Sequence, residues 1–458
     1  MSAGSVAKVV IVGAGPAGLN AAVVCAEAGV PSLILDEKPG IGGAIYGGET
    51  AKGRKQDQQA ARLFAAVKRL EAQIEISTES SVVGYFAEAG EIAYLKRGEL
   101  VRRRAGRVIL ATGCYERPQP FPGWELPGSM TVGAAQLHVK AGLVKPGRRV
   151  VLAGTGPLLL AAAKQLHEAG VEVVSVFEAG RRRDLLRHPL RLLSGTSLLL
   201  EGLGYVNYLA RHGIPLRFSW GVVEAKGKEM LEEVVVAPYD REWRPEIPRS
   251  LTLQADCLAV EYGFVSRTEL AQLLGCRQRF DKALGWVPVT DEWQRSSPRG
   301  IYVAGDGAGV YGAEAAAIQG RIAATACLVD GGLTLPPAAS RALARDRRRL
   351  AALKRFRRGF EDFSRLRAGL LDLPAEDTVI CRCENVRLKE IRKAVEAGAR
   401  DLASLKMGTR VGMGDCQGKV CGPFCHSLLA REGSAERAGF LRARFPLSPL
   451  PFSSLEEG

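Results

Sequence analysis

Four cysteines near the C-terminal end of the chain have a spacing that suits a metal site. They form a C-x-C pair and a C-x4-C pair in a glycine-rich setting, and they are Cys381, Cys383, Cys416 and Cys421. Four thiolates complete the ligand set of a [2Fe–2S] cluster, and glycines let backbone amides approach its sulfides. Structural zinc sites more often combine C-x2-4-C pairs, so the spacing favours the cluster, while zinc and inert thiols stay open.

A glycine-rich turn near the N-terminus is the second candidate site. Residues 8–12 read K-V-V-I-V, which predicts a buried strand, and a helix is expected over 19–28. The turn between them consists of Gly13, Ala14, Gly15, Pro16, Ala17 and Gly18. Its first glycine permits the tight turn, its second lets a pyrophosphate approach, and its third lets the helix pack on the strand. The amides at the helix N-terminus would bind the pyrophosphate of a dinucleotide.

Two acidic residues follow the next expected strand, residues 32–35, and could bind the ribose of that dinucleotide. They are Asp36 and Glu37. An acid at this point accepts hydrogen bonds from ribose hydroxyls, and the spacing from the glycine turn favours Asp36.

Three further segments indicate that the dinucleotide is FAD. A double glycine follows the acid, a strand over 107–110 precedes A-T-G, and a strand that starts at residue 300 ends in G-D. Their site residues are Gly42, Gly43, Ala111, Thr112, Gly113, Gly305 and Asp306. In this order they resemble the FAD site of flavoprotein reductases with two dinucleotide-binding domains. The carboxylate of Asp306 would accept a hydrogen bond from the flavin ribitol, and it would also suit the N-cap of a helix expected over 308–326.

A second dinucleotide-type pattern lies between these segments. A strand over 148–153 leads into Gly154 and Gly156, and the strand after the following helix ends in Glu178. Leu159 replaces the third glycine, and we expect its side chain to push the helix from the strand and crowd the turn. Glu178 suits a ribose hydroxyl and opposes a 2′-phosphate, so NADPH is disfavoured. An NADH site and a purely structural domain both stay open.

Composition predicts a multi-domain α/β protein. The chain has 458 residues, of which 47% are hydrophobic and 53 are glycine. No apolar stretch is long enough to span a bilayer, and residues 1–8 lack the features of a signal peptide, so we expect a cytoplasmic protein.

Disulfide bonds are not expected among the ten cysteines in that compartment. Five of them lie in apolar runs and are expected in the core, namely Cys25, Cys114, Cys257, Cys276 and Cys327. Cys425 follows Cys421 closely and is either a near-miss ligand or a bystander. No CxxC pair accompanies the flavin motifs, which argues against disulfide-reductase chemistry.

The net charge of +14 is concentrated in two arginine-rich segments, residues 181–191 and 341–367. Leucine and phenylalanine recur at helical spacing in the second segment, which predicts an amphipathic helix. Its basic residues would form a solvated face, or would meet an acidic partner subunit or an anionic membrane surface. No nucleic-acid-binding motif accompanies the charge, so a nucleic-acid partner is disfavoured.

The chain changes character at about residue 375, where short helices are expected over 387–397, from 401 and from 421. A unit of this size has a small core, which a cluster would stabilise. Together the patterns predict an α/β fold with two Rossmann-like domains, the second inserted in the first, and a small helical cluster domain. The expected domains are 1–122 with 285–335 (FAD-binding), 123–284 (inserted), 336–374 (basic helical linker), 375–435 (cluster) and 436–458 (tail).

The cysteine blocks C-R-C-E-N-V and M-G-D-C-Q-G-K-V-C-G-P resemble the BFD-like [2Fe–2S] domain. With the FAD pattern, the segment A-T-G-C-Y-E-R-P-Q-P-F-P-G-W and the altered second turn, the chain resembles one family from residue 8 to residue 426. This family comprises the α (A) subunits of dye-linked amino-acid dehydrogenases and opine oxidases, the B subunit of hydrogen cyanide synthase, and the α subunits of proline and hydroxyproline dehydrogenases. Its members commonly have glutamine after the double glycine, whereas this chain has Ala44.

The resemblance implies cofactors and partners. The implied cofactors are FAD, a [2Fe–2S] cluster and an FMN at a subunit interface, and some members hold ATP where FAD would bind. The implied partner is a β subunit similar to D-amino-acid or sarcosine oxidases, which carries its own FAD and oxidises the amine. A small γ subunit, an acceptor such as a quinone or a carrier protein, and peripheral contact with the inner membrane are compatible with the family.

These inferences predict an oxidoreductase subunit that relays electrons from a partner through flavin and cluster. No catalytic residue is assigned, and the lone histidines His138, His167, His188 and His212 are expected to be surface or core residues. Two alternatives stay open. One is a self-contained NADH-dependent reductase, and the other is an assembly subunit in which nucleotide and cluster are structural.

Overall fold

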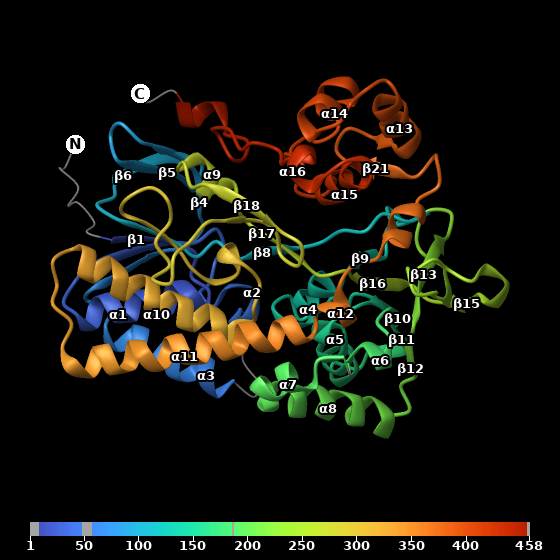
Figure 1. The fold of residues 1–458 in the computed structure, drawn as a ribbon, viewed down its shortest axis with the longest axis horizontal. Helices are drawn as coiled ribbons and strands as arrows, with labels where there is room; N and C mark the ends of the chain where they lie inside the picture. The colour runs from blue at the N-terminus through green and yellow to red at the C-terminus, as the bar shows by residue number, and fades with distance from the viewer. Residues whose placement is uncertain (1–8, 48–56, 186, 456–458) are drawn as a thin grey trace. The chain divides into compact units, whose positions relative to one another are not determined.

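Two five-stranded parallel sheets organise the protein in the computed structural model, which describes residues 9–47, 57–185 and 187–455 (Figure 1). Each sheet belongs to its own compact unit. The first unit runs to Tyr115 and includes Val265–Lys354 and the chain from Arg442 on, and the second comprises Glu116–Phe264 and Arg355–Leu441. Residues 1–8, which include Lys8 at the expected start of the first strand and were expected not to form a signal peptide, lie outside the described residues.

The sheet of the first unit has the order β20-β7-β1-β2-β3. Its strands are β1 (Val9–Val12), β2 (Ser32–Leu35), β3 (Ile74–Ser77), β7 (Val108–Leu110) and β20 (Ile301–Val303). Every residue of β1 and β2 is buried because both faces of the sheet are covered, as is usual for parallel sheets. The helices α1 (Pro16–Glu27), α3 (Gln58–Arg69) and α10 (Ala313–Asp330) share one core with Ile11 and Ile34.

The opposite face of this sheet packs against an antiparallel meander. Its strands are β4 (Ser80–Phe86), β5 (Glu91–Lys96) and β6 (Glu99–Arg104). Val10 and Leu33 of the parallel sheet share a core with Ile92 and Tyr94 of the meander. The C-terminal segment returns to the same unit, where the amide of Leu447 donates to the carbonyl of Val83.

The second unit repeats the arrangement with the strand order β12-β11-β10-β16-β9. Its strands are β9 (Ser129–Thr131), β10 (Arg149–Gly154), β11 (Glu172–Glu178), β12 (Leu216–Phe218) and β16 (Cys257–Glu261). One face packs against α4 (Val132–Lys140), α5 (Pro157–Glu168) and α8 (Thr196–Arg211). The other face packs against the antiparallel strands β13 (Trp220–Lys226), β14 (Glu233–Pro238) and β15 (Leu251–Gln254).

A paired ribbon carries the chain between the units. It consists of β8 (Cys114–Glu116) and β17 (Phe264–Ser266). The crossing points therefore fall at residues 115 and 264, whereas we expected them at 122 and 284. The expected linker is divided between the two units, because it belongs to the first unit only up to Lys354. The expected tail is divided as well, because it belongs to the first unit only from Arg442 on.

The basic segment forms the long helix α11 (Pro337–Gly359) followed by α12 (Glu361–Ser364). Apolar residues of α11 such as Leu350 and Leu353 are buried, so the helix is amphipathic as predicted. Some of its arginines are paired within the first unit, where Arg349 binds Glu314 on the neighbouring helix α10. The single helix expected over 341–367 ends early, at Gly359, where a β-carbon would lie 3.0 Å from Leu192.

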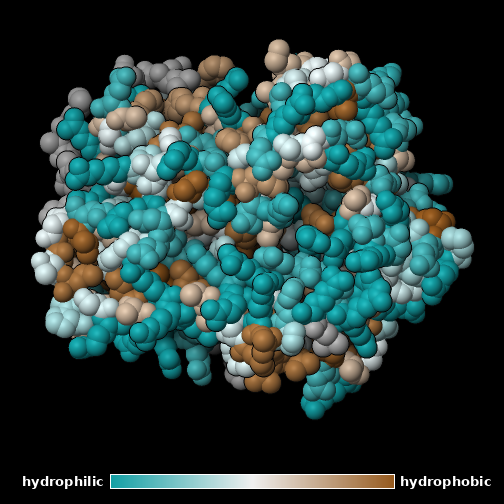
Figure 2. Space-filling view, in the orientation of Figure 1, coloured by the Kyte–Doolittle hydropathy of each residue, from teal (hydrophilic) through white to brown (hydrophobic). Residues whose placement is uncertain are grey.

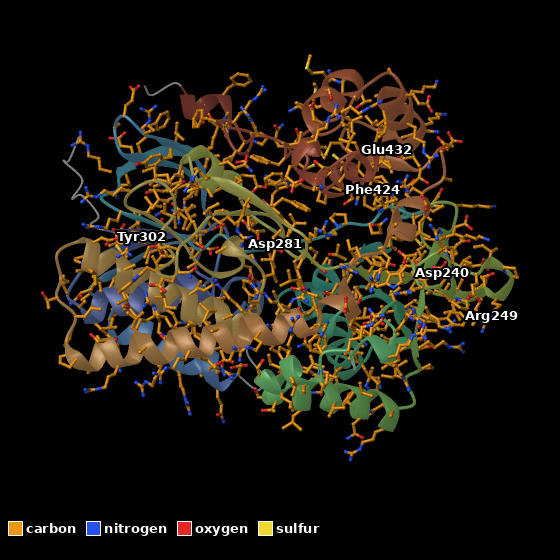
Figure 3. The ribbon with its side chains drawn as sticks, in the orientation of Figure 1. Asp240, Arg249, Asp281, Tyr302, Phe424 and Glu432 are labelled. Atoms are coloured by element: carbon orange, nitrogen blue, oxygen red, sulfur yellow. The ribbon has the colours of Figure 1, made fainter. Side chains whose placement is uncertain are left out.

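The cluster domain belongs to the second unit. It contains β21 (Val379–Cys381), β22 (Val386–Arg387), α13 (Leu388–Glu396), α14 (Leu402–Thr409) and α15 (Gly422–Glu432) around a core that includes Phe424, labelled in Figure 3. The indole of Trp124 donates to the carbonyl of Val379 at 2.7 Å, and the guanidinium of Arg382 lies 5.3 Å from the Trp124 ring. These contacts join the domain to the segment before β9.

Exposed leucines gather on the surface of α7 (Pro189–Leu192), η1 (Leu193–Gly195) and α8, at the lower centre of Figure 2. They include Leu190, Leu193, Leu200 and Leu203. Within the described residues, no helix has the length and apolar character needed to cross a membrane.

Candidate cofactor sites

The N-terminal glycine turn has the geometry of a nucleotide site. Gly13 has a φ of +107°, and a β-carbon there would overlap the carbonyl of Ala111, while one on Gly18 would overlap the carbonyl of Gly13. A β-carbon on Gly15 would meet only the α-carbon of Gly43, at 3.9 Å. The first and third glycines are therefore required by the packing of the protein itself. The second leaves space beside the turn, where a pyrophosphate would bind.

The two acids after β2 have different surroundings. Asp36 is buried, and its carboxylate accepts hydrogen bonds from the amides of Ala14 (2.6 Å) and Lys38 (2.8 Å). Glu37 instead forms an ion pair with Arg267 at 2.8 Å. Asp36 is thus the acid that reaches the glycine turn, in keeping with the preference for it. Its contact with a ribose stays a prediction.

The double glycine lies against the same turn. The amide of Gly42 donates to the carbonyl of Ala14 at 2.8 Å, and a β-carbon on Gly43 would lie 2.9 Å from the α-carbon of Gly15. Both glycines have a positive φ, at +109° and +65°. Ala44 follows in the short helix α2 (Gly43–Tyr46) and is exposed, so this position offers a flavin ring only a methyl group.

Asp306 supplies an unsatisfied carboxylate oxygen. Its Oδ1 atom is shielded from solvent and has no hydrogen-bond partner among the described residues, while Oδ2 lies 3.6 Å from the sulfur of Cys114 and the backbone amide of Tyr311 also acts on the carboxyl group. Burial raises the pKa of this carboxyl group to about 6. An unsatisfied buried acceptor is costly, so a ligand hydroxyl here would relieve the cost. The residues present therefore fit a flavin whose ribitol donates to Asp306.

Asp306 does not cap the long helix that follows it. Residues Gly305–Ala308 form the short 3-10 helix η3, and α10 begins only after Gly312, whose φ is +96°. The N-cap interpretation and the helix start at residue 308 were therefore wrong. The A-T-G segment after β7 and the G-D segment after β20 do meet, because a β-carbon on Gly307 would lie 2.9 Å from Oγ1 of Thr112.

Cys114 and Arg267 are residues of this site that the sequence analysis missed. Cys114 was expected in the core, but it is only partly buried and its thiol faces Asp306 because β8 begins directly after the A-T-G turn. Arg267 stacks on Tyr115 at 4.4 Å and pairs with Glu37. Only the pairing of β8 with β17 brings Arg267 here, so no local pattern could have indicated it. The other four cysteines that were expected in the core are all buried.

The second glycine turn is occupied by carboxylates of the protein. Glu178 is buried, and its side chain accepts from the amides of Gly156 (3.1 Å) and Gly180 (2.7 Å). Burial raises the pKa of Glu178 to about 7. A second buried acid, Glu261, interacts with the backbone amide of Leu159 in the first turn of α5. Leu159 itself is fully buried in the core on the α4 side of the sheet.

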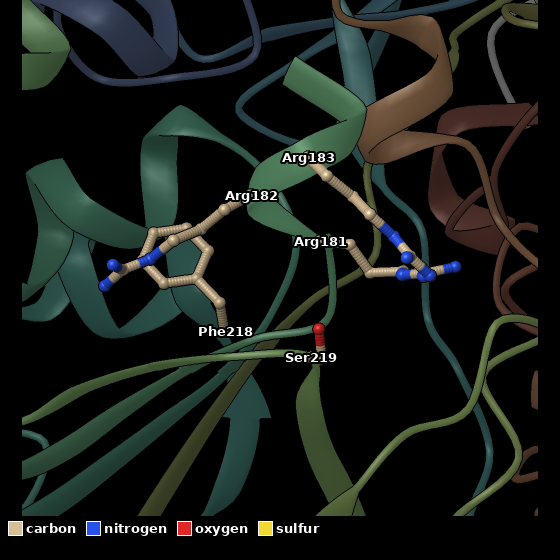
Figure 4. Close-up of a pocket in the computed structure, with 5 residues that line it drawn as sticks. All are labelled: Arg181, Arg182, Arg183, Phe218 and Ser219. Atoms are coloured by element: carbon tan, nitrogen blue, oxygen red, sulfur yellow. The ribbon is translucent and has the colours of Figure 1, made fainter. Parts of the chain in front are cut away.

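A basic pocket lies just beyond Glu178 (Figure 4). It is lined by Arg181, Arg182, Arg183, Phe218 and Ser219. The guanidinium of Arg182 lies 4.5 Å from the centre of the Phe218 ring, so part of the charge is held against an aromatic face.

The four cysteines of the C-terminal domain approach one another in two pairs. The thiol of Cys421 interacts with Cys381, and that of Cys416 interacts with Cys383. The pKa of Cys381 is lowered to about 5, first by Cys421 and then by the amides of Gly412, Glu384 and Cys383. Two pairs of thiols with amides directed at sulfur suit two irons that take two thiolates each. Within the described residues, no group of three or more His, Cys, Asp or Glu converges on a single ion.

Glycines allow these cysteines to approach each other. A β-carbon on Gly414 would overlap the β-carbon of Cys383, and Gly412 and Gly418 have φ values of +78° and +80°. Cys425 is buried in α15, and burial raises the pKa of its thiol to about 12, so it has the character of a core residue. The thiol set therefore fits a [2Fe–2S] cluster better than a single metal ion.

Comparisons with known proteins found matches for both parts of the chain. Residues 7–332 match the family described as Pyridine nucleotide-disulphide oxidoreductase, and residues 379–431 match the BFD-like [2Fe-2S] binding domain. The chain belongs to this oxidoreductase family. The HcnB subunit of hydrogen cyanide synthase from Pseudomonas protegens is 41% identical over 97% of this chain and 96% of its own length. The A subunit of opine oxidase from Agrobacterium tumefaciens is 33% identical over 97% of this chain and 90% of its own length.

Among solved structures, L-proline dehydrogenase from P. horikoshii has a similar fold, with a TM-score of 0.68 and 20% identity over 99% of this chain and 80% of that chain. The expected family, the mixed α/β fold and the [2Fe–2S] domain are confirmed. The chain is an oxidoreductase, and the matches indicate a flavin or nucleotide cofactor together with a [2Fe–2S] cluster.

Proposed function

We propose that this chain is the electron-transferring subunit of a heteromeric amino-acid or amine dehydrogenase. One observation carries the proposal. A single chain combines an accessible glycine turn beside the unsatisfied carboxylate of Asp306 with a four-thiol site, while carboxylates fill its second glycine turn. Such a chain can hold a redox dinucleotide and a cluster, but its second domain offers no free turn for a nicotinamide donor.

The residues of the first turn would hold FAD in defined roles. Gly15 leaves the space for the pyrophosphate and the amides that open α1 face it, while Asp36 would bind the ribose and Asp306 the ribitol. Cys381, Cys383, Cys416 and Cys421 would hold the cluster. When bound, the flavin accepts electrons in pairs and the cluster carries one at a time, which lets the chain split a two-electron oxidation into single steps.

A partner subunit would supply the electrons. Two of the relatives are named as subunits, of a hydrogen cyanide synthase and of an opine oxidase. We infer that an FAD-containing oxidase-like β subunit oxidises a secondary amine or amino acid, such as an opine, proline or hydroxyproline. FMN would lie at the interface of the two subunits, and a quinone or carrier protein would accept the electrons. ATP in place of FAD and a small γ subunit fit the same scheme.

The histidines are consistent with a relay that needs no general base on this chain. His167 contacts the hydroxyl of Tyr208 at 2.9 Å, and His188 pairs with Asp362 at 3.2 Å. His138 and His212 each contact the carbonyl one helical turn earlier. All four take part in local packing contacts.

The test is stepwise reduction of the purified chain loaded with flavin and iron. Photoreduction of the flavin without oxygen should be followed by the electron paramagnetic resonance signal of a reduced [2Fe–2S] cluster. The Cys383→Ser variant should still photoreduce its flavin but give no cluster signal. A chain that binds neither cofactor, or whose flavin is reduced while an intact cluster stays oxidised, would contradict the relay. Intact cofactors without any electron exchange would favour an assembly role.

A further inference from the structure

Each glycine turn of this chain follows the central strand of its sheet, but the second glycines differ in conformation, with a φ of −79° at Gly15 and +123° at Gly156. A β-carbon on Gly13 would overlap the carbonyl of Ala111, and a β-carbon on Gly154 would overlap the carbonyl of Glu261. Ala111 directly follows β7, which pairs with the central strand β1. Glu261 is the last residue of β16, which pairs with the central strand β10. Glu261 therefore stands in the second turn where Ala111 stands in the first.

The side chain of Glu261 lies inside the second turn. It is 2% exposed, and a β-carbon on Gly156 would lie 3.4 Å from its Oε1 atom. At the first turn, the corresponding β-carbon on Gly15 would have no side chain within 4 Å. The Glu261 carboxylate also interacts with the amide of Leu159, one of the amides at the N-terminus of α5. A pyrophosphate would need this space and these amides.

The surroundings of Glu261 are acidic. Glu116 and Glu178 both face it, while Arg357 is the cationic side chain that acts on it. The Oε2 atom of Glu261 has no hydrogen-bond partner among the described residues. A pyrophosphate would therefore meet a filled turn, and its negative charge would oppose ionisation of the buried acidic side chains around it.

We propose that Glu261 closes the second dinucleotide site by placing its own carboxylate where the pyrophosphate of NADH would bind. Glu178 accepts from the amide of Gly156 as Asp36 accepts from the amide of Ala14, so Glu261 and not Glu178 distinguishes the second turn. The domain keeps the strand–turn–helix arrangement of a nicotinamide site but carries a carboxyl side chain of the protein in the space of the ligand. The residues of this second turn do not fit a bound pyridine nucleotide, and a single substitution should reopen it. This inference does not depend on the proposed relay.

The experiment measures binding directly. Isothermal titration calorimetry with NADH and with ADP-ribose would compare the wild-type chain with two variants. Glu261→Ala copies the alanine of the first turn, and Glu261→Gln keeps the size of the side chain but cannot ionise. Glu224→Ala, on an exposed strand residue that pairs with Lys226, is the matched control. Flavin and iron content would establish that each variant is folded.

We expect no measurable binding to the wild type or to Glu224→Ala at about millimolar ligand. Glu261→Ala should bind both ligands at least about tenfold more tightly, and Glu261→Gln should fall between it and the wild type. If only one of the two Glu261 variants folds, that variant decides. The proposal is overturned if the wild type already binds NADH, or if folded Glu261 variants bind no better than the wild type.

Discussion

Replacing Asp306 with asparagine should stabilise the cofactor-free protein and weaken flavin binding. Burial raises the pKa of this carboxyl group from 3.8 to about 6. Its folded-state pKa lies above the unfolded value, so its contribution to stability is full below about pH 4 and is lost as the pH rises through 6. The difference corresponds to about 3 kcal/mol as an upper limit.

Asparagine cannot ionise, so the variant should not show this loss. Part of this gain in stability will be offset. The new amide group replaces an oxygen that lies 3.6 Å from the Cys114 sulfur, and a buried amide donor without an acceptor costs about 1–3 kcal/mol. We therefore expect a net stabilisation of about 1 kcal/mol at pH 8 and a net destabilisation of about 1–2 kcal/mol at pH 4, where the ionisation gain is nearly absent. Flavin should bind about ten- to hundredfold more weakly, because a charge-assisted hydrogen bond to the ribitol is lost.

The assay is urea unfolding of the cofactor-free protein at pH 4 and pH 8, with flavin affinity measured by fluorescence quenching. Asp330→Asn is the control of opposite sign, because Arg295 holds the pKa of Asp330 below its usual value and should make that variant less stable at pH 8. Equal stability differences at both pH values would refute the burial argument. Unchanged flavin affinity would refute the placement of the cofactor.

Four further substitutions test the cofactor sites and the packing of the cluster domain. Cys383→Ser should remove most of the iron and leave flavin bound, whereas Cys425→Ser should keep the iron; equal iron in both would contradict the ligand set. Gly15→Val should lose the flavin but fold normally, because its β-carbon meets only Gly43, at 3.9 Å; full flavin content would count against the turn. Trp124→Phe removes the 2.7 Å hydrogen bond to Val379 and should destabilise the second unit by about 1–2 kcal/mol in chemical denaturation, so an unchanged midpoint would show that this bond contributes little.

Local patterns were sufficient for much of the fold. The strand at 32–35 was predicted with its observed bounds, because an apolar run over 33–35 ends at an acid. The glycine turn was also predictable, since the close contacts of Gly13 and Gly18 follow from the strand–turn–helix sequence. The helix after this turn begins at Pro16 rather than at residue 19, because proline suits the first helical position.

Features that depend on distant strands could not be read locally. Glu261 lies in an apolar run, and only the parallel pairing of β16 with β10 places it at the second turn. Leu159 was expected to crowd the second turn, whereas the side chain that lies inside this turn is that of Glu261. Cys114 reached Asp306 for the same reason, because the two lie far apart in sequence and meet only through the order of β7 and β20.

The unit boundaries also depend on tertiary packing. The cluster domain packs with the second sheet through Trp124, a residue of the loop before β9, and the last residues return to the meander through Leu447. Neither contact could be predicted from the sequence, because the segments that it joins carry no recognisable motif. Domain limits drawn from motif positions alone therefore differ from the observed units.

The most direct test of the central claim is to mix the purified chain, with flavin and iron contents established, with NADH in the absence of oxygen and follow the flavin absorbance. If electrons come from a partner subunit, NADH should leave the flavin oxidised for minutes, while dithionite bleaches it and reduces the cluster. Rapid bleaching by NADH would contradict the account and identify the chain as a reductase that works alone.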